Sequence, residues 1–86
     1  MTTDDARSLL EAHGFRVAHA SGLEVRGVFG DTEVFLYRSL ANWWAVSAKK
    51  GITGKPQRVG QYNAPETHVQ SLQDWLRAQL REAVAA

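Results

Sequence analysis

Apolar side chains recur at helical spacing near the N-terminus, at Ala6, Leu9, Leu10 and His13. This period predicts a helix that runs from about Asp4 to His13. Thr2 and Asp5 stand at the spacing of a capping box, in which each side chain accepts a hydrogen bond from the other residue's backbone N–H group. Gly14 is typical of the residue that follows a helix, because glycine adopts positive φ without strain.

Between residues 15 and 48 the period becomes the alternation that is typical of β-strands. Turn signals at Ser21-Gly22, at Gly30-Asp31 and over residues 39–42 divide this stretch into short runs. Lys49 to Pro56 is rich in glycine and lysine and predicts a loop. Gln57 to Tyr62 is short and polar, as is typical of an edge strand. The pattern predicts three to five antiparallel strands.

The C-terminal part returns to a helical period, with an apolar stripe at Val69, Leu72, Leu76, Leu80 and Val84 and with Trp75 at its border. The helix is expected from about Pro65 to Val84, and Asn63 with Glu66 offers a capping pair. Helix, strands and helix in this order predict a two-layer α+β domain over residues 1–86, with an antiparallel sheet and terminal helices. The spacing between turns leaves no room for parallel crossovers.

Alternation divides the predicted sheet into two faces. The face toward the helices is expected to carry Leu23, Val25, Phe29, Val34, Leu36, Trp44 and Val46. The other face is expected to carry Arg26, Val28, Phe35, Tyr37, Trp43 and Ser47, which is unusually aromatic for a solvent-facing surface. Trp43 and Trp44 point to opposite faces, so Trp43 is expected to be the more exposed.

Three interpretations of the aromatic face stay open. One helix covers each face, so that both faces belong to the core. Alternatively, the face is a surface for a protein partner or a second copy of the chain. As a third interpretation, its aromatic rings stack on unpaired bases while neighbouring cations hold phosphates.

Composition narrows the class of protein. The chain has 86 residues, of which 44% are hydrophobic and 22% charged, as expected for one packed domain rather than a disordered chain. It has no cysteine, which excludes disulfides and thiolate metal sites and fits a reducing compartment. The acidic start does not resemble a signal peptide, and no apolar run approaches the roughly 20 residues of a membrane helix. A cytoplasmic protein is expected.

The formal net charge of +1 hides an uneven distribution, because no acid occurs between Glu33 and Glu66. That interval holds the cations Arg38, Lys49, Lys50, Lys55 and Arg58. Such a bias is typical of a surface that meets phosphates, and also of a solvated loop. Because these cations face no acid nearby in the sequence, their charge is expected to be free for a ligand.

Sequence motifs for catalysis are absent. Residues 51–56 have the wrong spacing for a P-loop, and Pro56 stands where the hydroxyl residue belongs. The three histidines are scattered, and nothing places a serine beside a base. Glu24, Asp31 and Glu33 lack the lysine of a restriction-type nuclease and are expected to serve turns and solubility. The sequence predicts a non-enzymatic protein without cofactor or metal.

The stretch LLEAHGFRVAHASG, residues 9–22, resembles the opening of HicA-type toxins, small ribonucleases with a double-stranded-RNA-binding-like fold. The resemblance implies a similar topology. In that family a histidine that carries the chemistry follows this region, whereas Leu23 and Glu24 follow it here. Ribonuclease activity is therefore not implied.

Residues 43–75 resemble the three-stranded-sheet-plus-helix domains of integrase arm-binding regions and of plant ethylene-response factors. A tryptophan-bearing strand, a basic turn, the run GKPQRVGQY and a helix opened by Pro65-Glu66-Thr67 carry the resemblance. Those domains lay their sheet in the major groove of DNA. By position, the resemblance implies DNA contacts from Trp43, Lys49, Lys55, Arg58 and Arg38.

Two functions follow as hypotheses. The first is binding of DNA or RNA through the basic loop and the adjacent sheet face, by Arg38, Trp43, Lys49, Lys50, Lys55 and Arg58. Loop lysines follow a backbone without reading bases, so weak sequence preference is expected. The second is a protein-interaction module, such as an inhibitor, adaptor or homodimer, that uses Arg26, Phe35, Tyr37 and Trp43.

Overall fold

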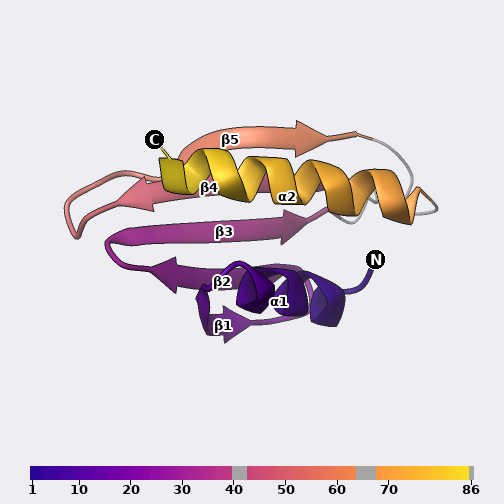
Figure 1. Ribbon diagram of the computed structural model, residues 1–86, viewed down its shortest axis with the longest axis horizontal. Helices are drawn as coiled ribbons and strands as arrows, with labels where there is room; N and C mark the ends of the chain where they lie inside the picture. Colours follow the sequence, from indigo (N-terminus) through magenta and orange to yellow (C-terminus); the bar gives the residue numbers. More distant parts are fainter. Residues whose placement is uncertain (40–42, 64–67, 86) are drawn as a thin grey trace.

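The computed structural model describes residues 1–39, 43–63 and 68–85. Over these ranges the chain forms two helices and one five-stranded antiparallel sheet, which confirms the predicted α+β class (Figure 1). The strands follow one another across the sheet in chain order. The elements are α1 (Thr3–Ala12), β1 (Arg16–Ala20), β2 (Glu24–Phe29), β3 (Thr32–Arg38), β4 (Trp44–Lys50), β5 (Gln57–Tyr62) and α2 (Val69–Ala85).

Both predicted caps of α1 are present. The backbone N–H of Asp5 donates to Thr2 Oγ1 at 3.2 Å, and the backbone N–H of Thr2 donates to Asp5 Oδ2 at 2.9 Å. At the other end Gly14 has φ +84°, and the Phe15 N–H donates to the Leu10 carbonyl at 3.0 Å. This hydrogen bond, which closes a Schellman motif, turns the chain from α1 into β1.

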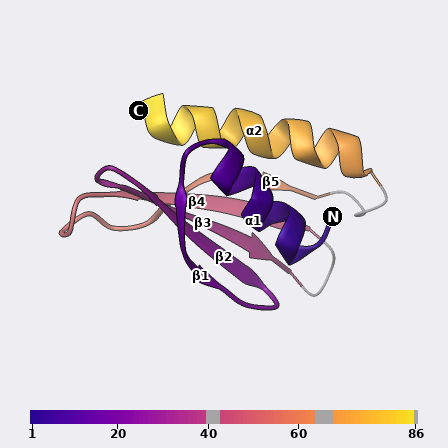
Figure 2. The ribbon, with the colours of Figure 1, turned by 60° about the horizontal axis from the view of Figure 1, so that its bottom comes forward.

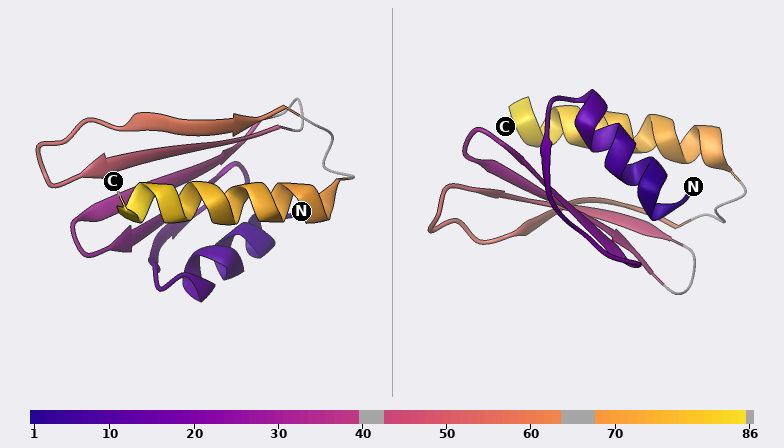
Figure 3. Two further views of the ribbon diagram at one scale, coloured as in Figure 1. Left: turned by 45° about the horizontal axis from the view of Figure 1, so that its top comes forward. Right: turned by 90° about the horizontal axis from the view of Figure 1, so that it is seen from below.

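Helices α1 and α2 lie on the same side of the sheet, as the edge-on views show (Figures 2 and 3). Helix α1 packs on β1 and β2, whereas α2 packs on β3, β4 and β5. The interpretation in which one helix covers each face is therefore wrong. The physical reason is that the other face carries paired charges, so the apolar stripes of both helices find a matching surface on one side only.

The core lies between the helices and the sheet. Its fully buried members include Val25, Val34, Leu36, Trp44 and Val46 from the sheet and Leu10, Leu72, Leu76 and Leu80 from the helices. Gly27 of β2 lies directly under α1, where a Cβ atom would approach Leu10 and Phe15 side-chain atoms to 3.1–3.3 Å. A glycine at this position lets α1 come close to the sheet.

Four apolar residues that were expected in the core are exposed. Leu23 precedes β2, and Phe29 ends it, where the ring packs against Phe15 with 5.6 Å between centroids. Val69 and Val84 lie in the first and last turns of α2, and Ala83 takes the buried position instead. All four lie at the ends of their elements or directly outside them.

The predicted loop over Lys49 to Pro56 is too long. Lys49 and Lys50 belong to β4, because they pair with Glu33 and Thr32 of β3 and continue the ladder. The predicted edge strand at Gln57 to Tyr62 is confirmed as β5. Helix α2 begins at Val69, and the expected start at Pro65 with the Glu66 cap lies outside the described residues.

Candidate nucleic-acid interface

One face of the sheet is covered by no helix of the described part of the chain, and we call it the open face (Figure 3). Strand register assigns its residues, since side chains that pair across neighbouring strands share a face. They are Arg16 and His19 of β1, Glu24, Arg26 and Val28 of β2, Glu33, Phe35 and Tyr37 of β3, Ala45, Ser47 and Lys49 of β4, and Arg58 and Gln61 of β5. The predicted assignment of Arg26, Val28, Phe35, Tyr37 and Ser47 to this face is confirmed.

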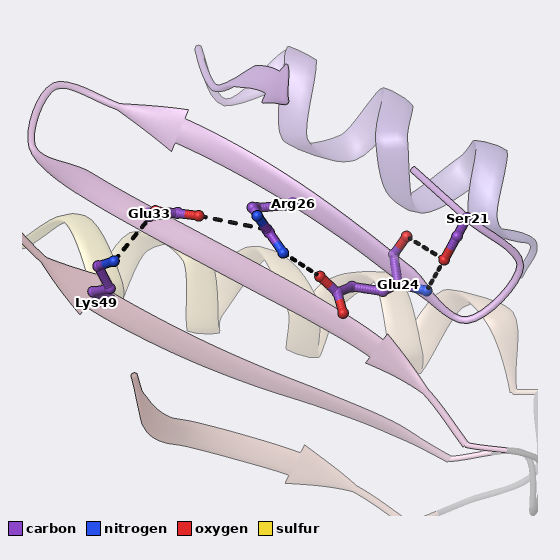
Figure 4. A network of polar contacts seen from close by, with 5 residues as sticks. All are labelled: Ser21, Glu24, Arg26, Glu33 and Lys49. Atoms are coloured by element: carbon purple, nitrogen blue, oxygen red, sulfur yellow. Dashed lines mark hydrogen bonds and ion pairs between the residues drawn. The ribbon is translucent and has the colours of Figure 1, made fainter. Parts of the chain in front are cut away.

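A chain of alternating charges crosses the open face from β2 to β4 (Figure 4). Arg26 Nη2 donates to Glu24 Oε1 at 3.2 Å. Arg26 Nε lies 3.4 Å from Glu33 Oε1, an ion pair without hydrogen-bond geometry. Lys49 Nζ lies 3.9 Å from Glu33 Oε2. The two carboxylates therefore hold the Arg26 guanidinium in place from both sides.

The expectation that Phe35 is an exposed aromatic contact is wrong. Only 7% of its surface is exposed, although it lies on the open face. The Arg26 guanidinium carbon lies 5.1 Å from the centre of the Phe35 ring and covers it, and Tyr37 flanks it. A cation held over a ring in this way is attracted by the electron density of the ring face. Phe35 supports the surface but offers little contact area.

A hollow of about 490 Å³ lies in the open face, within the range of small-ligand sites. Its floor includes Ala45 and Ser47 of β4, whose side chains are short compared with those on the strands beside them. Its lining is Ser21, Leu23, Glu24, Tyr37, Arg38, Ser39, Trp43, Ala45, Ser47 and Arg58. The site therefore combines two aromatic rings, two arginines and one carboxylate.

Tyr37 and Trp43 are the aromatic residues of the hollow. The Tyr37 ring is nearly parallel to that of Phe35, at 7° with 6.2 Å between centroids. Burial and the neighbouring Glu24 carboxylate raise the pKa of Tyr37, while Arg26 lowers it, so its hydroxyl keeps its proton at neutral pH. The Ser39 N–H donates to the Trp43 carbonyl at 2.8 Å and fixes the backbone beside the indole.

The predicted contrast between the two adjacent tryptophans is confirmed. Trp44 is 1% exposed and belongs to the core, whereas Trp43 is half-buried and lines the hollow. Alternation was sufficient for this prediction, although Trp43 directly precedes β4 instead of belonging to it.

The five candidate cations do not share one face. Arg38 and Arg58 line the hollow, and Lys49 lies on the open face. By register Lys50 lies on the helix side, opposite Thr32, where it lines a second hollow together with Arg58 and Ala83, and Lys55 is exposed in the loop before β5.

The expectation that these cations lack an acid nearby is wrong for Lys49, because strand pairing brings Glu33 opposite it. Arg58 has no acidic partner among the described residues. Its Nη1 donates to Gln61 Oε1 at 2.7 Å, which leaves its charge available.

Glu24 and the small residues of the floor were not among the predicted site residues. Glu24 alternates with Val25, so its position on the same face as Arg26 was available from the sequence. Ala45 follows Trp44, and a small residue between large neighbours is a signal for a depression. The hollow itself depends on β5 lying beside β4, which the pattern did not reveal.

Among the described residues, no group of three or more histidines, cysteines or acids could hold a metal ion. Glu24 and Glu33 lie in the ion-pair chain, and Asp31 lies in the turn between β2 and β3. Within the described ranges, no helix is long and apolar enough to cross a membrane. Comparison with family models, with curated proteins and with solved structures found no match.

Proposed function

We propose that the protein binds single-stranded DNA or RNA on the open face of its sheet and carries out no chemistry on it. The observation that supports this most strongly is the hollow between Tyr37 and Trp43, with Arg38 and Arg58 in its wall. A cytoplasmic location, expected from the sequence, is part of the same proposal.

Aromatic rings at the hollow suit unpaired bases. Every base has a flat face that stacks on an aromatic side chain, and each such contact contributes about 1–3 kcal/mol. In a duplex the bases are stacked on one another and present only their edges. A surface that offers Tyr37 and Trp43 beside a low floor therefore favours single strands over duplexes.

Cations of the hollow, of the open face and of the neighbouring loop would contact the phosphates of the same nucleic-acid strand. Arg58 lies at its wall without an acidic partner among the described residues. Lys49 lies on the same face, and Lys55 lies exposed in the loop between β4 and β5. We assign phosphate contacts to these three residues, whereas Lys50 points toward the helix side and is left out of the site.

Fluorescence anisotropy of labelled oligonucleotides tests this proposal. Single-stranded RNA, single-stranded DNA and a duplex of equal length are titrated with the protein at low and moderate salt. Trp43→Ala is expected to weaken single-strand binding about tenfold, the loss of one stacked base. Phe29→Ala is the matched control, because Phe29 is an exposed aromatic residue that packs on Phe15 instead of lining the hollow. The affinity of the Phe29→Ala variant for single strands is expected to equal that of the wild type.

Three outcomes oppose the proposal. Binding absent even at low salt would overturn it, and a concentration-dependent dimer in sedimentation that Trp43→Ala dissolves would then assign the open face to protein contacts. Tighter binding of the duplex would favour the sheet-in-groove arrangement implied by the integrase-type resemblance. Equal losses in the two alanine variants would show that the hollow is not the site.

A further inference from the structure

Glu24 is the one acidic residue among those that line the hollow, which otherwise suits an anionic ligand. The side chain is 25% exposed, and it lies opposite Tyr37 across the β2–β3 pair. Its Oε1 accepts the hydrogen bond from Arg26, whereas Oε2 has no partner among the described residues (Figure 4). A carboxylate oxygen of this kind favours a ligand group that donates hydrogen bonds.

The geometry points to guanine as the base that the hollow selects, an inference that rests on the proposed single-strand binding. On its Watson–Crick edge guanine presents two adjacent donors, N1–H and the 2-amino group, which match the two oxygens of a carboxylate. Each carboxylate oxygen has two lone pairs, so Oε1 can accept from guanine and from Arg26 together. Bidentate contacts of this kind are the ones that discriminate between bases most strongly.

The other bases fit this acceptor less well. Adenine and cytosine each present one amino group beside a ring nitrogen that is itself an acceptor. Uracil and thymine present one N–H between two carbonyl oxygens, which the carboxylate repels. Guanine also carries the acceptors O6 and N7, for which the Ser47 hydroxyl and Arg58 offer donors in the same hollow.

Arg26 acts as a positioning residue for Glu24. It is held between Glu24 and Glu33 and lies over the Phe35 ring, so its guanidinium is fixed by three neighbours. The hydrogen bond to Oε1 in turn fixes the plane of the Glu24 carboxylate. A preformed acceptor loses less conformational entropy on binding than a mobile side chain does.

The experiment uses short single strands of uridine with one variable central base, which is guanosine, inosine, adenosine or uridine. Inosine lacks only the 2-amino group, so the comparison isolates one of the two proposed hydrogen bonds. The guanosine strand is expected to bind about tenfold more tightly than the inosine strand, as for one good base-edge contact. Glu24→Gln is expected to bring this ratio close to one, because an amide offers only one acceptor oxygen.

Glu11→Gln is the matched control, since Glu11 also pairs with an arginine, Arg7, but lies on α1 and does not line the hollow. It is expected to keep the preference for guanosine, and thermal melts establish that both variants are folded. Equal binding of all four strands overturns the guanine inference but leaves single-strand binding in place. A preference that survives in Glu24→Gln overturns the role of Glu24. Failure of every strand to bind overturns the proposed function itself.

Discussion

Phe35 alternates onto the open face, and yet its ring is almost completely covered. The cover comes from Arg26, which is fixed there by carboxylates on two strands. Alternation predicts which side of the sheet a residue takes, but exposure depends on the neighbours across the sheet. The alternation therefore predicted the different exposure of Trp43 and Trp44, which lie on different sides of the sheet. It did not predict the burial of Phe35, which lies on the open face but is covered by a neighbouring side chain.

Leu76 is the residue at which packing is most simply tested. It lies in the middle of α2, has no exposed surface and belongs to the core between α2 and the sheet. Leu76→Ala is expected to lower the free energy of unfolding by about 2–5 kcal/mol, because it removes buried methyl groups and leaves a cavity. Chemical denaturation measures this change, and an unchanged midpoint would contradict the packing of α2 on the sheet.

At the scale of elements, the sequence predicts some of the ends of helices and strands and misses others. The Thr2–Asp5 box and Gly14 were predicted because a cap depends on residues that are close together in the chain. The exposure of Leu23 and Val84 was not predicted, because it depends on where the opposite layer stops. The extension of β4 to Lys50 likewise depends on the length of β3, which is remote in the sequence.

Asp5 gives the capping box a pH dependence. Hydrogen bonds from the Thr2 backbone and then from its side chain lower the pKa of Asp5 in the folded state. Its contribution to stability is therefore complete above its unfolded pKa near 3.8 and is lost as the pH falls through the folded value. Asp5→Asn is expected to lose less than about 1 kcal/mol near neutral pH, since the side chain is exposed.

Parallel denaturation series of the wild type and Asp5→Asn measure this effect. The difference between them is expected to shrink below about pH 4. Other carboxylates titrate in both proteins, and taking the difference removes their contribution. A difference that stays constant down to about pH 2 would show that the Asp5 carboxylate does not stabilise α1.

At the scale of the whole molecule, the sheet has one face covered by both helices and one open face that carries charged side chains, although the net charge is only +1. The sequence predicted the α+β class and the aromatic side of the sheet, because both follow from local periods. It predicted two layers but left open whether one helix covers each face, since both arrangements bury the same stripes. It also did not predict that Lys49 meets Glu33, because strand pairing brings together residues that are 16 apart.

Substitution of the two adjacent lysines of β4 tests which face of the sheet binds nucleic acid. Lys49 lies on the open face and Lys50 on the helix side, so the two have the same chemistry and opposite directions. For a single strand, the logarithm of affinity falls with the logarithm of salt concentration by about 0.7 for each phosphate neutralised. Contacts from Arg58, Lys49 and Lys55 therefore predict a slope of about −2.

Arg58→Gln is expected to make that slope less steep by about 0.7, because it removes a cation with no acidic partner among the described residues. Lys49→Gln is expected to have a smaller effect, since Glu33 already neutralises part of its charge. Lys50→Gln is the control and is expected to leave the slope unchanged. If Lys50→Gln reduced the slope as much as Arg58→Gln does, phosphates would be bound from both sides of the sheet, and the proposal that binding is confined to the open face would be wrong.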